Sequence, residues 1–311
     1  MFLIILLYAL LASTFTLGKA ALDYGRPFFL IAVRMFVGGG ILLSYQYFAD
    51  RSKFYLKTKD LFLFSQIFLF HIYLSYMLEF WALEYLSAAS VGLIYNISPF
   101  VTAIFSYFLF HERLSGKQNL GLIIGFFGLL PIIMQQTPEE IAVGSFYVSL
   151  PELALFISVA AACYGWIVMK QLLDRGYTPV MVNGVGMIVG GSMALLTSLW
   201  WDGLPVIKPA ESEGLIRPFL INILGSHGAG IAIFAWYALL LVVVANIIFY
   251  NLYGELLKKY SATFLSFVGF ITPLFAALFG WLMRGEEVTW HFFASVIFVT
   301  FGLYVFYQDE L

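Results

Sequence analysis

The sequence is poor in charged residues. Lys, Arg, Asp and Glu make up 11% of its 311 residues, while 62% are hydrophobic. A soluble domain carries about 25% charged residues, so this chain has too few to cover a water-facing surface. The composition excludes an ordinary soluble protein and predicts that a lipid bilayer surrounds most of the chain. The formal net charge of -2 gives no indication of nucleic-acid binding.

Several features that carry chemistry are also missing. The single cysteine, Cys163, excludes an intrachain disulfide and is interpreted as a small packing residue. The sequence has no H-E-x-x-H motif, no glycine-rich phosphate loop and no ATP-binding motif, and its four histidines are scattered. We therefore expect no catalytic residue, no metal site and no cofactor, which disfavours a membrane-embedded enzyme. The absence of a TVGYG-like filter argues against a channel of that type.

Long apolar stretches are abundant. A helix needs about 20 apolar residues to cross the hydrocarbon core of a bilayer. Ten stretches meet this need, approximately 2–22, 27–48, 61–83, 87–110, 119–135, 151–173, 178–200, 231–254, 261–283 and 290–307. The first has no basic segment before it, so we expect a retained helix rather than a cleaved signal peptide. The sequence thus predicts an all-α integral membrane protein with ten transmembrane helices.

The distribution of basic residues predicts the orientation of these helices. Connections on the same side as the amino terminus contain ten Lys and Arg residues, and those on the other side contain five. The positive-inside rule therefore predicts that both termini are cytoplasmic. The longest connection, about 201–230, would then be external.

The chain contains an internal repeat. YLSAASVGLIYNISPF, which begins at Tyr85, resembles KYSATFLSFVGFITPLF later in the chain. A shift of 174 residues aligns Ser87 with Ser261, Ala88 with Ala262, Pro99 with Pro273, Glu112 with Glu286 and Gly128 with Gly302. We expect two five-helix units, residues 1–136 and 150–308. Because five is odd, the second unit would cross the membrane upside down, an arrangement typical of secondary transporters.

Two segments carry a resemblance to a known family. SPFVTAIFSYFLFHERLSGKQNLGLIIGFFGL and TPLFAALFGWLMRGEEVTWHFFASVIFVTFGL share a Pro-x12-Glu spacing, followed by a helix that contains glycine. With the ten helices and the repeat, they resemble the EamA-type drug/metabolite transporter superfamily over nearly the whole chain. The resemblance implies a carrier of small metabolites that works by alternating access in a bacterial inner membrane. With no ATP site, its energy would come from an ion gradient or from exchange.

The first two stretches carry a narrower resemblance. YALLASTFTLGKAALDYGRPFFLIAVRMFVGGGILL is similar to the S-adenosylmethionine transporters of obligate intracellular bacteria. This implies uptake of S-adenosylmethionine in exchange for S-adenosylhomocysteine. The alternative is an exporter of amino acids or other amphipathic metabolites from the same superfamily. Both functions require a small-molecule substrate and a lipid bilayer, and a homodimer is one arrangement to test.

Two charged residues within the apolar stretches are candidate substrate ligands. Arg34 lies well inside the second stretch, where a charge usually faces a cavity or a partner. It could anchor a substrate carboxylate or form an internal ion pair. Glu79 lies near the outer end of the third stretch, where it could bind a cationic substrate or simply be solvated. His71, two turns deeper, is a candidate for proton coupling or for a neutral buried histidine.

Aromatic and amide side chains complete the predicted site. Aromatic rings could stack on an adenine or hold a cation, although rings at the interface form membrane belts. The predicted substrate-binding residues are Arg34, Tyr73, Tyr76, Glu79, Asn96, Tyr164, Trp166, Asn246 and Tyr250.

Prolines and glycines predict how the helices bend and pack. Pro99 and Pro273 lie inside the fourth and ninth stretches, where each should kink its helix, as a hinge or as a static bend. Glu112 and Glu286 are interpreted as capping or gate-closing carboxylates. Glycines at four-residue spacing, such as Gly121 with Gly125, predict close approach between helices.

Overall fold

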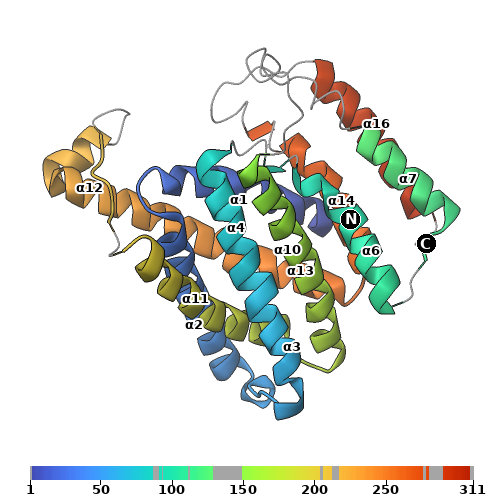
Figure 1. Ribbon diagram of the computed structural model, residues 1–311, viewed down its shortest axis with the longest axis horizontal. Coiled ribbons are helices and arrows are strands. Elements are labelled where there is room, and N and C mark those ends of the chain that lie inside the picture. Colours follow the sequence, from blue (N-terminus) through green and yellow to red (C-terminus); the bar gives the residue numbers. More distant parts are fainter. Residues whose placement is uncertain are drawn as a thin grey trace.

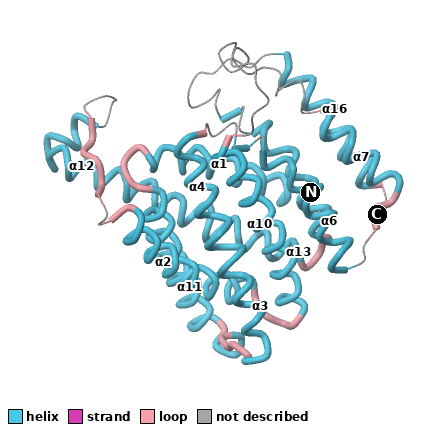
Figure 2. The backbone as a smooth tube through the Cα atoms, in the orientation of Figure 1, coloured by secondary structure: helices cyan, strands magenta, loops and turns pink. Residues whose placement is uncertain are grey.

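A computed structural model describes residues 2–86, 91–92, 94–110, 113–128, 149–203, 206–211, 217–275, 278–279 and 290–308. Over these ranges the protein consists of helices and loops, with no strand (Figure 2). The Ser-Ala pair at 87–88 and the glutamates at 112 and 286 lie outside the described residues. We call residues 2–128 the first half and residues 149–308 the second half.

The described residues of the first half form five main helical segments and, between the second and the third, the short 3₁₀ helix η1. The third segment runs without a break through four elements, one of which is a π-helix (η3). The first two segments are α1 (Phe2–Leu22) and α2 (Pro27–Ala49), and η1 (Arg51–Lys53) follows α2. The third segment consists of η2 (Thr58–Asp60), α3 (Leu61–Gln66), η3 (Ile67–Leu74) and α4 (Ser75–Tyr85). The fourth consists of η4 (Tyr95–Ile97) and α6 (Ser98–Phe110), and the fifth is α7 (Gly116–Phe127).

The described residues of the second half also form five helical segments, and the third of these again includes a π-helix (η5). The first two segments are α10 (Leu150–Asp174) and α11 (Pro179–Trp201). The third consists of α12 (Arg217–Leu241), η5 (Val242–Phe249) and α13 (Tyr250–Leu257). The fourth consists of α14 (Ala262–Val268) and η6 (Gly269–Ile271), and the fifth is α16 (Trp290–Tyr307).

Local sequence explains where several helices begin. Pro27 and Pro179 occupy the first turn of α2 and α11, where their missing N–H costs nothing. Ser149 and Glu152 form a capping box that starts α10, and Ser115 and Gln118 do the same for α7. The predicted starts of the second, sixth and seventh stretches are therefore confirmed to within a residue or two.

The predicted start of the eighth helix was wrong. The sequence suggested an external connection at about 201–230, which contains charges of mixed sign and three prolines. Instead α12 begins at Arg217, and Gly225 bends it with a φ of 71° that glycine adopts without strain. Helical turns on both sides of this bend extend α12 to one end of the molecule (Figure 1).

The described helices suit a bilayer. Six helical segments are long and apolar enough to span it, and shorter apolar helices cover 262–275 and 296–306. Large apolar side chains are exposed along these helices, which would be costly in water but is favourable against lipid. The protein is therefore a multi-pass, all-helical membrane protein.

The main packing pairs join one half to the other. α2 packs on α11, α7 on α16 and α6 on α14, while α10 packs on α4 and η3, and α1 packs on α12 and η5. The pairing of α7 with α16 is visible at the right of Figure 1. If the two halves are exchanged segment by segment, each pair maps onto a pair in this set. This pattern is what a duplicated unit would produce.

Local backbone irregularities also recur in both halves. The π-helices η3 and η5 each span eight residues at matching places in the third and eighth segments. The 3₁₀ turns η4 and η6 each lie just before a proline, Pro99 and Pro273. The prediction of prolines inside regular helices is therefore refined: each proline follows a 3₁₀ turn, where the lost N–H disrupts the ladder less.

Glycines allow close approach between the halves. A Cβ atom built on Gly121 would lie 2.7 Å from the backbone oxygen of Gly302, across the contact between α7 and α16. A Cβ on Gly190 would lie 2.7 Å from Ile72 Cγ2 on η3. The predicted packing role of these glycines is confirmed, since any side chain would push the helices apart.

Candidate substrate site

A narrow cavity lies where the two halves meet, and we call it the central cavity. Its volume is about 70 Å³, whereas pockets for small molecules usually measure about 300–1,000 Å³. A metabolite could enter only if the helices moved apart. The lining residues are Tyr8, Leu11, Thr14, His71, Ser75, Tyr76, Glu79, Tyr95, Ser98, Val159, Ala162, Cys163, Trp166, Ala245, Phe249, Tyr250, Tyr253 and Ser266.

Aromatic rings form one wall of the central cavity. Trp166 on α10 stacks on Tyr253 of α13, with centroids 3.8 Å apart and planes 17° from parallel. Tyr250 lies 5.1 Å from Trp166 and 6.0 Å from Tyr76. His71 meets Trp166 edge-on at 4.3 Å. This wall offers π-faces that can stack on a planar base or hold a cation.

Arg34 lies one side chain behind this wall. It is 1% exposed, and its Nε donates to Oδ1 of Asn246 at 3.2 Å. Its guanidinium carbon lies 4.6 Å from the centre of the Tyr76 ring and 5.0 Å from that of Phe80. The two terminal nitrogens have no hydrogen-bond acceptor in standard geometry among the described residues. Tyr76 therefore separates a buried cation with spare donors from the central cavity.

Asn246 fixes the position of Arg34. Its amide nitrogen lies 3.2 Å from the sulfur of Met35 and 3.4 Å from that of Met187. The amide oxygen of Asn246 is thereby turned toward Arg34 and accepts a hydrogen bond from its Nε. Asn246 lies on η5, so the second half orients a charge that the first half carries.

Glu79 lines the central cavity directly. It is 5% exposed, and its Oε2 accepts a hydrogen bond from the Tyr95 hydroxyl at 2.5 Å. The expectation of a solvated carboxylate near the interface is therefore wrong. Lys19 explains the difference, because its ammonium donates to the carbonyl oxygens of Leu83 and Leu86 and so closes the end of α4 above Glu79. Lys19 thus caps the C-terminal end of α4.

The structure brings only some of the predicted ligands together. Tyr76, Glu79, Trp166 and Tyr250 line the central cavity. Tyr73 turns away and shares a hydrogen bond with Thr197 at 2.7 Å.

Two further predicted ligands lie off the cavity. The Tyr164 hydroxyl donates to Oε1 of Gln66 at 2.6 Å. Asn96 is buried on η4, next to the lining residue Tyr95.

Backbone irregularities bear on which residues line the cavity. An α-helix repeats its face every three to four residues, but a π-helix widens the turn. His71 and Tyr76, both singled out from the sequence, are five residues apart and both line the cavity. Tyr95 and Ser98 are among the lining residues that sequence reasoning missed. Tyr95 and Ser98 lie four residues and one residue before Pro99, so the position of the proline was the available signal.

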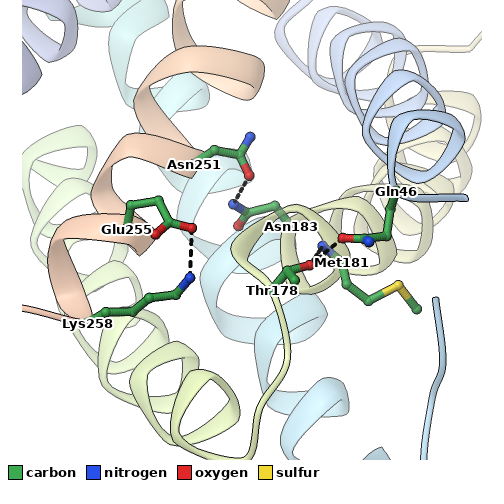
Figure 3. Close-up of polar contacts among 7 residues, drawn as sticks. All are labelled: Gln46, Thr178, Met181, Asn183, Asn251, Glu255 and Lys258. Carbon is green, nitrogen blue, oxygen red and sulfur yellow. Dashed lines mark hydrogen bonds and ion pairs between the residues drawn. The ribbon is translucent and has the colours of Figure 1, made fainter. Parts of the chain in front are cut away.

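Polar contacts between the halves lie near the C-terminal end of α2 and the N-terminal end of α11. Asp60, which is fully buried, accepts from Arg175 and from the Tyr177 hydroxyl, and we call these three residues the clamp. Figure 3 shows Thr178 donating to Oε1 of Gln46, at 2.5 Å. Within the second half, Figure 3 also shows the Asn183 amide donating to Oδ1 of Asn251 at 3.2 Å. The clamp and the hydrogen bond from Thr178 to Gln46 hold one side of the interface between the halves shut.

A larger, charged vestibule lies toward the other side. Its volume is about 610 Å³, and it is formed by the turn after α1, the end of α4 and the segment before α12. The backbone N–H of Lys208 donates to the Tyr24 carbonyl at 2.8 Å, which ties that segment to the turn. The charged residues that line the vestibule are Lys19, Asp23, Glu84, Lys208, Glu211 and Arg217. Within the described ranges, no group of three or more His, Cys, Asp or Glu side chains could hold a metal ion.

Comparisons with known proteins agree with this architecture. The EamA-like transporter family model matches residues 1–134 and 149–308. The S-adenosylmethionine/S-adenosylhomocysteine transporter of Chlamydia muridarum (strain MoPn / Nigg) is 30% identical over 99% of this chain and 92% of its own length. The protein of the same name from Chlamydia trachomatis serovar L2 is 30% identical over 99% and 89%.

A solved structure shows the fold alone. One crystal structure superposes with a TM-score of 0.71 and 16% identity, over 98% of this chain and 93% of that chain.

The matches to the family model cover both halves, so the chain belongs to the EamA-like transporter family. It is therefore a membrane transporter of a family built from helices, and the resemblance noted in the sequence is confirmed.

Proposed function

We propose that this protein exchanges S-adenosylmethionine for S-adenosylhomocysteine by alternating access. The observation that carries the proposal is the match, along essentially the full length of both chains, to chlamydial transporters of that name. The central cavity adds chemical support, because it combines stacked aromatic rings with a carboxylate and a nearby guanidinium.

Each part of an adenosyl amino acid has a candidate partner at the site. Arg34 can pair with the carboxylate once Tyr76 moves aside, since its two terminal nitrogens have no acceptor in standard geometry among the described residues. Glu79 can attract the positive charge of the substrate. The stacked pair of Trp166 and Tyr253 offers a flat face for adenine. Each cation–π contact contributes about 0.5–2 kcal/mol, depending on desolvation.

Widening of the central cavity requires moving parts. Pro99 and Pro273 are the proposed hinges, because each follows a 3₁₀ turn that already departs from the α-helix. Their placement at matching positions would let each half open one side in turn. The clamp closes the side of the interface on which α2 ends, and the vestibule lies on the opposite side.

The proposed setting is a bacterial inner membrane with both termini in the cytoplasm. The excess of basic residues on the side of the termini supports this orientation. The clamp would then lie on the cytoplasmic side and the vestibule outside. The two halves would cross the membrane in opposite senses, as expected for two units of five helices.

Ligand competition tests the proposed substrate. Purified protein is heated with a panel that includes S-adenosylmethionine, S-adenosylhomocysteine, adenosine and the aromatic amino acids. We expect the two adenosyl amino acids to raise the melting temperature and to block uptake of labelled S-adenosylmethionine. If aromatic amino acids compete and adenosyl compounds do not, the protein is instead an amino-acid exporter of the same family.

A further inference from the structure

The inference concerns the charge of Glu79. Among the described residues that line the central cavity, Glu79 is the only carboxylate, and none is Lys or Arg. No ion pair within 4.0 Å joins it to Arg34, whose Nε is held by Asn246. An ionised carboxylate buried in apolar surroundings is costly unless a cation or a proton neutralises it. Glu79 therefore needs one or the other whenever the cavity is closed.

The surroundings of Glu79 supply no mobile cation. Arg34 on α2 is a fixed charge behind the Tyr76 ring, and Lys19 on α1 is bound to the carbonyls that end α4. The remaining titratable groups near the cavity are neutral side chains at ordinary pH or a buried imidazole. They are Tyr8 on α1, His71 on η3, Tyr76 on α4, Tyr95 on η4, Cys163 on α10, and Tyr250 and Tyr253 on α13.

The two proposed substrates differ by one positive charge. S-adenosylmethionine carries a sulfonium, an ammonium and a carboxylate, so its net charge is +1. S-adenosylhomocysteine has a neutral thioether in place of the sulfonium, so its net charge is zero. A single site that closes around both must absorb this difference.

We propose that Glu79 absorbs it by exchanging a proton. When S-adenosylmethionine is bound, Glu79 is ionised and neutralises the additional charge. When S-adenosylhomocysteine is bound, Glu79 holds a proton instead. Tyr95 suits both states, because its hydroxyl can donate to the carboxylate or accept from the acid. This inference rests on the proposed function and adds a coupled ion to it.

The charge balance of a full cycle follows. One S-adenosylmethionine, with charge +1, moves inward, and one neutral S-adenosylhomocysteine moves outward together with one proton. The net charge moved is zero, so the membrane potential neither drives nor opposes the exchange. Proton release must accompany binding of S-adenosylmethionine. Lower pH therefore weakens binding of S-adenosylmethionine and favours binding of S-adenosylhomocysteine.

Proteoliposomes test this balance with the wild-type protein alone. Vesicles are loaded with S-adenosylhomocysteine and a pH-sensitive dye, and labelled S-adenosylmethionine is added outside. A potassium gradient with valinomycin then sets the membrane potential. We expect initial uptake to change less than twofold between potentials of opposite sign. The lumen should become alkaline, with one proton lost for each S-adenosylmethionine gained.

The Glu79→Gln variant tests the residue. Glutamine preserves the size of the side chain but cannot exchange a proton. Binding of S-adenosylmethionine should weaken tenfold or more, while binding of S-adenosylhomocysteine should change less than threefold. Residual exchange should leave the lumenal pH unchanged and respond to the potential. Glu255→Gln is the matched control, because Glu255 is exposed, pairs with Lys258 at 2.7 Å (Figure 3) and does not line the cavity.

Two results would overturn the inference. In the first, wild-type uptake accelerates with an inside-negative potential and the lumenal pH stays constant. In the second, Glu79→Gln retains proton-coupled exchange. A complete lack of adenosyl transport would be a different failure, because it would refute the proposed function and the inference with it.

Discussion

Substitution of Arg34 by glutamine should separate binding from stability. Arg34 is 1% exposed and its Nε donates to Asn246, while its two terminal nitrogens have no acceptor in standard geometry among the described residues. A buried charge that is not fully paired and hydrogen-bonded costs free energy, so replacing it with a neutral polar side chain need not destabilise the protein. We therefore expect the melting temperature of the unliganded Arg34→Gln variant to match or exceed that of the wild type.

Ligand binding should respond in the opposite direction. Without Arg34, the substrate carboxylate would enter a cavity with no fixed cation behind its wall. Leaving a charged group without its partner costs about 1–3 kcal/mol, which raises Kd roughly five- to 150-fold. Titration calorimetry in detergent measures this change directly. Arg34→Lys should fall between the two, because it keeps the charge but loses the planar fork of donors.

A matched control makes the result interpretable. Arg51 is exposed on η1 and stacks over Tyr47, so Arg51→Gln removes an arginine that faces solvent. Its Kd should remain within twofold of the wild-type value. If folded Arg34→Gln also binds within twofold of the wild type, Arg34 does not hold the carboxylate.

Three further predictions concern the moving parts and the orientation. Pro99→Ala and Pro273→Ala should each slow exchange more than they weaken binding, and unchanged exchange in both variants would leave the prolines as packing features. Asp60→Asn should lower the free energy of unfolding by about 1–3 kcal/mol, because the clamp loses the negative charge that pairs with Arg175 and one of the two oxygens that accept from Arg175 and Tyr177. Arg175 is 47% exposed, so water compensates in part, and chemical denaturation with an Asp50→Asn control measures the difference. A tag placed after Leu311 should react with an impermeant label only after cells are opened, and labelling in intact cells would contradict the orientation.

The sequence predicts the helices well because their cause is local. Composition alone requires a bilayer, and Pro27 and Pro179 mark helix starts through their own backbone chemistry. The exception is α12, whose first turns lie within the connection predicted at about 201–230. Glycine adopts the φ of 71° at position 225 without strain, so the chain bends there while helical turns form on both sides.

The site was harder to predict because it depends on helix register. A regular α-helix is the natural assumption, and it cannot tell which of Tyr73 and Tyr76 faces inward. The π-helix η3 decides this, since it brings Tyr76 to the cavity and leaves Tyr73 beside Thr197. The choice between a solvated Glu79 and a substrate-binding Glu79 stayed open, because the cap that Lys19 provides joins residues far apart in the chain. Such long-range contacts are not visible in local spacing.

Counterflow is the most direct test of the proposed exchange. Proteoliposomes are loaded with unlabelled S-adenosylhomocysteine, S-adenosylmethionine, an aromatic amino acid or buffer, and entry of labelled S-adenosylmethionine is followed. We predict saturable entry that is accelerated at least fivefold by either adenosyl compound inside, and not by the amino acid. Entry that is equal in all four vesicle populations, or that is accelerated only by the amino acid, would contradict the proposed exchange.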